Sequence, residues 1–112
     1  MIGPNYRNNI RLVGTNRNDT GAVQIYYNKE WGTICNKDFD RLDGNVICRQ
    51  LGYARMERQL NVSDLTTPVT GRIWLTGLKC HGFEEQIAQC PSAGFGQTGC
   101  LHDRDVVLKC YG

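Results

Sequence analysis

Residues 31–53, WGTICNKDFDRLDGNVICRQLGY, contain the two patterns that decide the fold. The first five residues mix aromatic, β-branched and cysteine side chains, which is typical of a strand. From residue 40 onward, apolar residues recur every three or four positions, which is the spacing of one helix face. The sequence therefore predicts a strand that is followed, after a short connection, by an amphipathic helix.

The helix is expected to lie between Asp40 and Gly52. Asp40 precedes the first apolar residue and is a good N-cap, because its side chain can accept hydrogen bonds from the free amides of the first turn. Gly52 follows the last apolar residue and suits the left-handed position after a helix. The apolar stripe of this helix consists of Leu42, Val46, Ile47 and Leu51.

Short strands are expected on both sides of this segment. Residues 22–27 alternate in polarity, with Val23, Ile25 and Tyr27 on one side, which predicts a half-buried strand that forms a hairpin with residues 31–35. The other expected elements are strands at 10–14, 54–60, 72–78 and 106–110, a short helix at 84–90, and loops at 61–71 and 91–99. These elements predict an α+β fold: a small disulfide-rich domain whose curved antiparallel β-sheet cradles one α-helix, with a short second helix and long loops.

Length and composition limit what the chain can be. Its 112 residues allow one domain, and a hydrophobic content of 40% argues against intrinsic disorder. The formal net charge of +2 excludes nucleic-acid binding driven by bulk charge, and no apolar run is long enough to insert into a membrane. The first residues have no apolar core and are not a secretion signal. We therefore expect residues 1–9 to be an N-terminal flank and 10–112 to be one domain of a larger multidomain protein.

The six cysteines predict disulfide bonds rather than a metal site. No two of them are separated by two to four residues, which is the spacing that structural zinc sites usually need. An even number of cysteines fits an oxidising compartment, although spacing alone cannot choose among the pairings. The sequons at Asn18 and Asn61 are candidate N-glycosylation sites and also fit a secretory route.

Five motifs together resemble the signature of scavenger receptor cysteine-rich domains. The resemblance spans about residues 10–111, and the six cysteines resemble the group A type of that family. The motifs are Arg11-Leu12-Val13-Gly14, Trp31-Gly32-Thr33-Ile34-Cys35, Val46-Ile47-Cys48-Arg49-Gln50-Leu51-Gly52-Tyr53, Ile73-Trp74-Leu75, and Cys80-His81-Gly82-Phe83-Glu84 with Cys90.

The resemblance implies a specific disulfide pairing. The implied bonds are Cys35–Cys100, Cys48–Cys110 and Cys80–Cys90. The first two would close long loops, each worth up to about 4 kcal/mol through the entropy of the unfolded chain. The second would tie the helix to the last strand, and the third would close the loop around the short second helix.

The family often binds calcium, and this chain departs from the residues that do so. At the positions of the two family aspartates it has Asn36 and Lys37, while Glu84 stands at the glutamate position. Calcium needs several oxygen ligands and net negative charge, so Lys37 disfavours the ion and is expected to form a salt bridge with Glu84. Asp38, Asp40 and Asp43 are candidate ligands of a displaced calcium site, but the favoured explanation is that Asp40 caps the helix and Asp43 lies in its first turn.

No catalytic residues are predicted. Neither Ser63 nor Ser92 lies in a nucleophile elbow, the cysteines are expected to be oxidised, and no nucleotide-binding motif is present. His81 is expected to be a loop residue and His102 a surface residue. The sequence thus favours a module that is not an enzyme and that needs no cofactor.

The arginines are the best candidates for ligand binding. Guanidinium groups pair bidentately with sulfate, phosphate and carboxylate groups, and family members commonly bind polyanions through arginine-rich surfaces. The alternative is that these charges are scattered and only keep the surface solvated. Trp31 and Trp74 are expected to pack in the core. The candidate ligand-binding arginines are Arg11, Arg55, Arg58, Arg72 and Arg104.

These observations predict an extracellular, non-catalytic recognition module, either secreted or part of a membrane protein's ectodomain. Its expected partners are anionic polysaccharides, lipoproteins, microbial surfaces or extracellular proteins, without specific nucleic-acid binding or membrane insertion. The alternatives are an accessory domain of a larger secreted enzyme, of the serine protease or lysyl oxidase type that carries this domain in the family, and an adhesion or spacer domain.

Overall fold

A two-residue turn joins the first long hairpin of the sheet. In a computed structural model, which describes residues 9–95 and 99–112, β2 (Thr20–Tyr27) and β3 (Glu30–Ile34) are connected by Asn28 and Lys29. Both turn residues have positive φ values, 51° and 65°, the backbone that a tight hairpin requires. The hairpin predicted from the alternation of residues 22–27 is present, two residues longer at its start.

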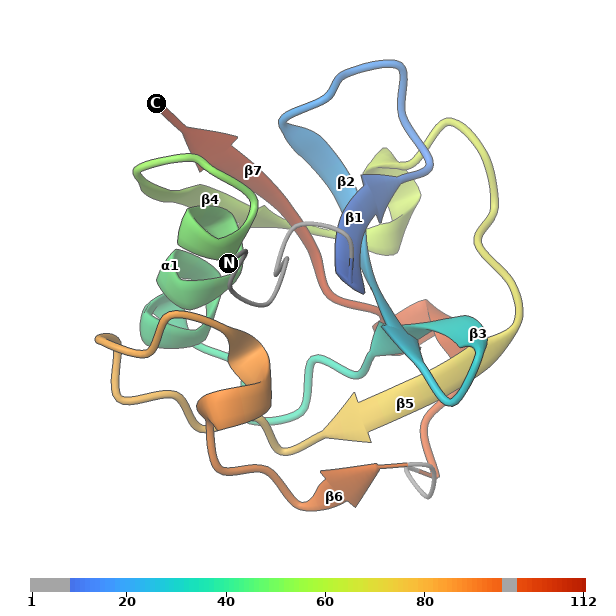
Figure 1. Cartoon of the computed structure of the whole chain (residues 1–112). Coiled ribbons are helices and arrows are strands. Elements are labelled where there is room, and N and C mark those ends of the chain that lie inside the picture. The colour runs from blue at the N-terminus through green and yellow to red at the C-terminus, as the bar shows by residue number, and fades with distance from the viewer. Residues whose placement is uncertain (1–8, 96–98) are drawn as a thin grey trace.

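The sheet has seven strands and curls around the core (Figure 1). The strand order is β4-β7-β2-β3-β5-β6, and β1 pairs with β2 outside this path. The remaining strands are β1 (Ile10–Val13), β4 (Arg55–Leu60), β5 (Arg72–Thr76), β6 (Gly94–Phe95) and β7 (Val107–Tyr111). Because β2 is central, its residues 21–25 are buried on both faces, so the prediction of a half-buried strand was wrong.

Helix α1 (Arg41–Gln50) lies against β4 and β7 (Figure 1). Asp40 caps it, accepting hydrogen bonds from the amides of Leu42 and Asp43, and Gly52 follows it at a φ of 102°. Val46 and Ile47 are fully buried, whereas Leu42 is 44% exposed. The helix and both of its boundary signals are therefore confirmed, while Leu42 lies outside the core.

Helix α1 also covers the free edge of β4. The Arg41 guanidinium donates a 2.8 Å hydrogen bond to the Met56 carbonyl oxygen, and the Asn45 side chain accepts a 2.9 Å bond from the Met56 amide. These contacts occupy backbone groups that another strand would otherwise pair with.

The predicted α+β architecture is confirmed, with two differences. Strands β3 and β5 run parallel, so the sheet is mixed rather than antiparallel. The helix expected at 84–90 is only a 3₁₀ turn at Ile87–Gln89, because the Glu84 side chain bonds to amides that precede it and Gln86 is extended.

Of the expected N-terminal flank only Asn9 is described. No helix in the described part of the chain has the length and apolarity needed to cross a membrane.

Three disulfides connect the elements. The structure pairs Cys35 with Cys100, Cys48 with Cys110 and Cys80 with Cys90, as the resemblance implies. The second bond joins α1 to β7, and both of its cysteines are at most 2% exposed. The core that surrounds it includes apolar side chains of α1 and of strands β1 to β5 and β7.

Candidate ligand-binding surface

Three of the five candidate arginines lie over aromatic rings. The guanidinium carbon of Arg11 is 4.0 Å from the centre of the Trp31 ring. The corresponding distances are 4.2 Å for Arg55 over Tyr111 and 5.1 Å for Arg72 over Trp74. Each contact holds a flat cation against a ring and leaves donor groups at its edge.

The register of β1, β2 and β3 brings Arg11 to Trp31. Arg11 lies opposite Gln24, and the next strand pairs Tyr26 with Trp31. Arg11 Nε donates a 2.8 Å hydrogen bond to Gln24 Oε1, and the rings of Tyr26 and Trp31 are 5.3 Å apart. Trp31 is thus half-buried on the outer face of the sheet, contrary to the prediction that it packs in the core.

Arg72 has an acidic partner as well as an aromatic one. Its Nε is 3.6 Å from Glu30 Oε1, and the Trp74 indole beneath it donates a 2.9 Å hydrogen bond to the Glu30 carbonyl oxygen. Trp74 is only 4% exposed, which agrees with its predicted place in the core. The ion pair leaves Arg72 less available to an external anion than Arg11.

Strands β4 and β7 carry a second group of basic residues, which we call the β4–β7 basic face: Arg55, Arg58 and Lys109. The register places Arg55 opposite Tyr111 and Arg58 opposite Lys109, so each pair shares one side of the ribbon. Lys109 Nζ is 3.5 Å from a Glu57 carboxylate oxygen, whereas Arg58 has no ion pair or hydrogen bond to another described side chain. Sequence reasoning missed Lys109, because only the pairing of β4 with β7 places it beside the arginines.

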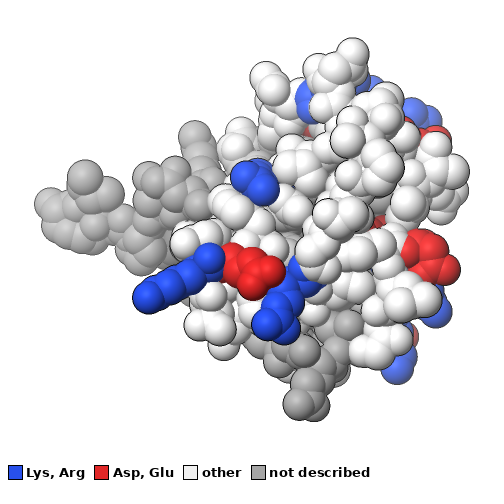
Figure 2. Space-filling model, turned by 90° about the vertical axis from the view of Figure 1, so that its right-hand side faces the viewer, with Lys and Arg blue, Asp and Glu red and all other residues white. Residues whose placement is uncertain are grey.

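The candidate arginines do not all converge. β4 lies at one end of the strand order and β5 near the other, and Figure 1 shows them on different sides of the molecule. On the face shown in Figure 2, basic side chains stand apart or next to an acidic one and form no continuous patch. Arg17 is tied to Asp19 at 3.0 Å, and Arg17 lowers the pKa of that carboxyl to about 2.

Arg104, rather than Glu84, lies beside the residues that resemble the family's calcium site. Its Nε donates to Asn36 Oδ1 at 3.3 Å, and its carbonyl oxygen accepts the Asn36 amide at 2.7 Å. Glu84 is bonded elsewhere, and the expected salt bridge with Lys37 is absent among the described ion pairs. Two cationic side chains, Lys37 and Arg104, therefore flank Asn36.

The three aspartates that follow perform structural roles or lie apart. Asp40 caps α1, and Asp43 accepts hydrogen bonds from the amides of Asp40 and Cys80 at 2.9 and 2.6 Å. Burial raises the pKa of Asp43 to about 6, although both bonds oppose this. Asp38 is exposed, and its carbonyl oxygen accepts a bond from Lys79. This geometry supports capping over a displaced calcium site.

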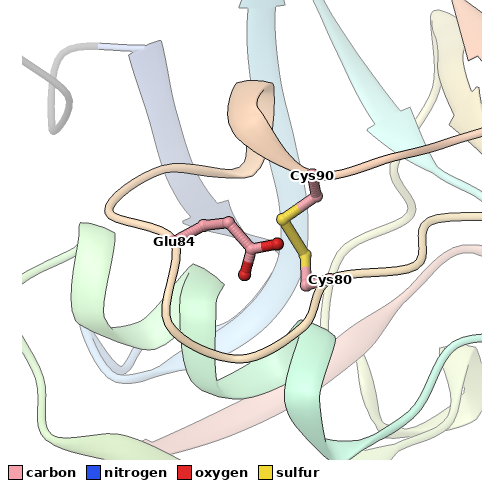
Figure 3. Close-up of side chains that lie close together, drawn as sticks. All are labelled: Cys80, Glu84 and Cys90. Carbon is pink, nitrogen blue, oxygen red and sulfur yellow. A yellow bond between two sulfur atoms is a disulfide. The ribbon is translucent and has the colours of Figure 1, made fainter.

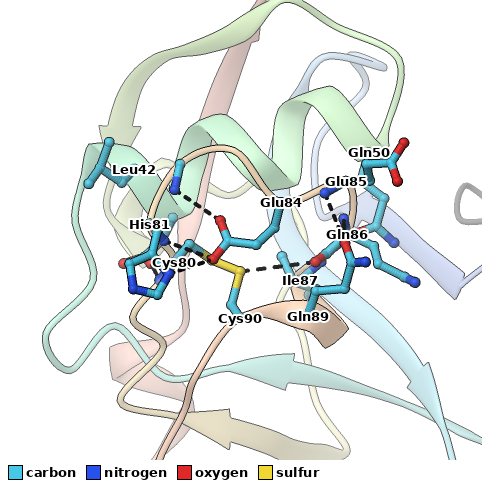
Figure 4. The surroundings of a disulfide bond; sticks show 12 residues. Leu42, Gln50, Cys80, His81, Glu84, Glu85, Gln86, Ile87, Gln89 and Cys90 are labelled. Carbon is cyan, nitrogen blue, oxygen red and sulfur yellow. Dashed lines mark hydrogen bonds and ion pairs between the residues drawn. A yellow bond between two sulfur atoms is a disulfide. The ribbon is translucent and has the colours of Figure 1, made fainter.

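Glu84 organises the loop that the third disulfide closes. Its carboxylate points toward the Cys80–Cys90 bond (Figure 3), but bonded sulfurs are not thiolate ligands for a metal. The amides of His81 and Gly82, each 2.9 Å away, and the His81 ring hold the carboxylate in place (Figure 4). The His81 amide is the main reason that the pKa of Glu84 is lowered to about 2.

His102 belongs to a buried network rather than to the open surface. Its Nδ1 is 2.7 Å from Asp105 Oδ2, its Nε2 is 2.8 Å from the Gly71 carbonyl oxygen, and Asp105 accepts a 2.7 Å bond from the Thr33 hydroxyl. The carboxylate lies between the hydroxyl and the imidazole, so the hydroxyl has no direct contact with a base. The network ties the start of β5 to β3 and is not arranged for nucleophilic catalysis.

This network predicts a loss of stability at alkaline pH. Burial alone would lower the pKa of His102, but the bonds to Gly71 and Asp105 outweigh it and raise the pKa. The stabilisation is therefore complete below the unfolded pKa, about 6.5, and is lost as the pH rises through the higher folded value. We expect the free energy of unfolding to fall as the pH rises above about 6.5, and to fall less in His102→Gln. Parallel curves for the two proteins, measured by urea denaturation, would contradict this.

The fold and this surface define a class: a small disulfide-bonded domain with arginines on the strands of a curled sheet. A sequence model of the scavenger receptor cysteine-rich domain matches residues 13–111. The chain belongs to the scavenger receptor cysteine-rich family.

The curated relatives that this chain matches are much longer proteins. Lysyl oxidase homolog 2 of Xenopus laevis is 40% identical over 102 residues, and the macrophage receptor MARCO of Mus musculus is 38% identical over 102 residues. Both alignments cover 90% of this chain but only 13% and 18% of the relatives. The similarity therefore concerns one domain.

Solved structures agree with the family assignment. The dimeric form of the domain from mouse MARCO has a TM-score of 0.73 and 35% identity, covering 96% of this chain and 99% of that one. The third such domain of murine neurotrypsin has a TM-score of 0.78 and 33% identity, covering 90% and 94%. Family, disulfide framework and fold thus agree.

Proposed function

We propose that this domain is an extracellular, non-catalytic module that captures anionic macromolecules through its arginines, without calcium. The observation that carries the proposal is the β4–β7 basic face. There two exposed arginines and Lys109 lie on adjacent strands, and Glu57 is the one acid paired with them among the described residues. Acidic polysaccharides, lipoproteins and microbial surfaces are partners with suitable charge.

The chemistry of the face suits sulfate and carboxylate groups. Arg55 packs over the Tyr111 ring at 4.2 Å, so it loses less side-chain freedom when it binds a ligand than a mobile arginine would. Arg58 has no described partner to give up. Because the net charge is only +2, local grouping rather than bulk charge has to supply the attraction.

The surroundings of Asn36 support the proposed independence from calcium. Calcium needs several oxygen ligands, and the side chains that flank Asn36 are Lys37 and Arg104. We therefore expect chelation to leave ligand binding unchanged.

Binding to immobilised dextran sulfate tests the proposal. For the oxidised domain we expect affinity to fall steeply with salt and to be the same with calcium or with EDTA. We expect Arg55→Ala/Arg58→Ala to weaken binding by about tenfold at physiological salt, since two charge-assisted contacts are lost.

Lys29→Ala/Lys79→Ala is the matched control, because it removes the same charge from the turn between β2 and β3 and from a loop where Lys79 bonds to the Asp38 carbonyl oxygen. An equal loss in both variants would assign binding to bulk charge. Abolition by EDTA would mean that a calcium site exists, and no binding at all would exclude polyanion capture.

An accessory role in a larger enzyme is the second candidate. The observation that favours it is that the matched lysyl oxidase homologs carry such a domain as a small part of their length. In that case the domain would position a substrate or a partner and perform no chemistry itself. Adhesion through self-association is a third candidate, and concentration-dependent association without polyanion affinity would favour it.

Two sequons fit the proposed secretory origin. Asn18 lies in an exposed turn before β2, and Asn61 is exposed at the start of a 3₁₀ turn, Val62–Asp64. We propose both as N-glycosylation sites. Expression in a eukaryotic secretory system, followed by enzymatic deglycosylation and mass spectrometry, would measure the occupancy of each.

A further inference from the structure

The outer face of β1, β2 and β3 carries a second arginine site of different composition, which we call the Arg11 platform: Arg11, Gln24, Tyr26 and Trp31. The guanidinium is fixed at two points, by the bond from Nε to Gln24 and by its position 4.0 Å above the Trp31 ring. Gln24 is only 7% exposed and therefore cannot move away easily. Among the described residues, none accepts a hydrogen bond from the two terminal nitrogens of Arg11, so these donors can face a ligand.

Arg11 has no acidic partner among the described residues, which distinguishes it from Arg72 and Arg17. Its one side-chain hydrogen bond to a described residue is to the neutral amide of Gln24. A cation without a compensating charge, held in a fixed orientation, favours a planar anion that accepts two parallel hydrogen bonds. A carboxylate has that geometry.

An exposed aromatic surface continues from the cation. Tyr26 is 44% exposed, and its ring packs against Trp31 with the two planes tilted by 56°. An exposed ring of this size can pack against the C–H face of one sugar ring.

We propose that the Arg11 platform is a subsite for one uronic acid residue of an acidic glycan. Arg11 pairs with the carboxylate, while the aliphatic face of the sugar ring lies against Tyr26. This inference rests on the proposed function, because it names a ligand class for one part of the anion-binding surface. The Arg11 platform differs from the β4–β7 basic face because it requires a sugar ring and a carboxylate in the ligand, whereas the basic face requires only a high density of negative charge.

Two probes separate the subsite from general polyanion capture. A hyaluronan tetrasaccharide has carboxylates but no sulfate, and dextran sulfate has sulfates but no uronic acid. For Arg11→Lys, which keeps the charge but loses the planar group, we expect about a tenfold loss of tetrasaccharide affinity and less than a twofold change with dextran sulfate. Arg55→Ala/Arg58→Ala should show the reverse. Affinities come from titrations followed by two-dimensional NMR.

Tyr26 supplies a second comparison that does not depend on Arg11. Tyr26→Phe keeps the ring and should bind the tetrasaccharide within twofold of the parent, whereas Tyr26→Leu should bind about fivefold more weakly. Far-UV circular dichroism and thermal melting establish that each variant is folded, and the Tyr26 pair decides the question if Arg11→Lys does not fold.

Several results would overturn the subsite. The first is that the parent domain binds dextran sulfate but not the tetrasaccharide. The second is that Arg11→Lys and the parent bind the tetrasaccharide with equal affinity. The third is that a sulfotyrosine peptide binds through Arg11 while the tetrasaccharide does not bind. Each of these leaves the proposed function standing. Failure of the parent to bind dextran sulfate would instead refute general polyanion capture. If the tetrasaccharide also did not bind, the subsite would be refuted as well. Tetrasaccharide binding that requires Arg11 would leave the subsite standing.

Discussion

Replacing Cys48 and Cys110 by alanine is expected to lower the free energy of unfolding by about 4 kcal/mol. The bond joins residues that are 62 positions apart, so breaking it releases a long loop in the unfolded chain. It also connects α1 to β7 through the core, where both cysteines are almost fully buried. For a domain of this size such a loss is a large share of the total stability.

The Cys80–Cys90 bond supplies the control for this expectation. It spans only 10 positions, so its removal should cost about 3 kcal/mol or less. Guanidinium chloride denaturation of both double-alanine variants under identical conditions measures the difference. If the short bond contributed as much as the long one or more, loop entropy would not be the main source of the stabilisation.

Elements with signals in their own sequence were predictable. Helix α1 is one, because Asp40, Gly52 and the positions of Val46 and Ile47 all favour the same helix. The helix expected at 84–90 failed because tertiary contacts decided the backbone there. Glu84 bonds to the amides of His81 and Gly82, and Gln50 of α1 accepts the Ile87 amide at 2.9 Å. Acidic residues at the start of a segment do not distinguish a helix from such a loop.

Pairing between distant strands limited the prediction of the site. The arginine candidates were chosen by residue type, but the register of β1 with β2 and of β4 with β7 decides which rings and charges they meet. Only that register places Trp31 beneath Arg11 and Tyr111 beneath Arg55. In the same way, Arg104 rather than Glu84 lies beside Asn36. Sequence reasoning could not find this contact, because the two residues are 68 positions apart. His102 was expected at the surface because nothing local indicates its bond to Gly71.

The close approach of β3 to Trp74 explains why residues 31–35 contain a glycine. A Cβ atom at Gly32 would lie 2.3 Å from Trp74 Cδ1, 2.7 Å from Nε1 and 3.0 Å from the Cβ of Arg72. The indole is fixed by its hydrogen bond to the Glu30 carbonyl oxygen and by the edge of the Tyr27 ring, whose centre is 5.1 Å away. It therefore has little freedom to make room for a methyl group.

Gly32→Ala is accordingly expected to destabilise the domain by about 3 kcal/mol, at the upper end of overpacking effects. Gly44→Ala is the comparison: its Cβ would lie 2.2 Å from Met56 Sδ and 3.0 Å from Met56 Cβ, but the thioether can rotate away and alanine favours the helix, so we expect a smaller cost of about 1 kcal/mol. Urea denaturation compares the two. In a Trp74→Phe background, where the ring is smaller, Gly32→Ala should cost clearly less, because the clash is with the indole. An unchanged cost in that background would mean that the strain arises in the β3 backbone instead.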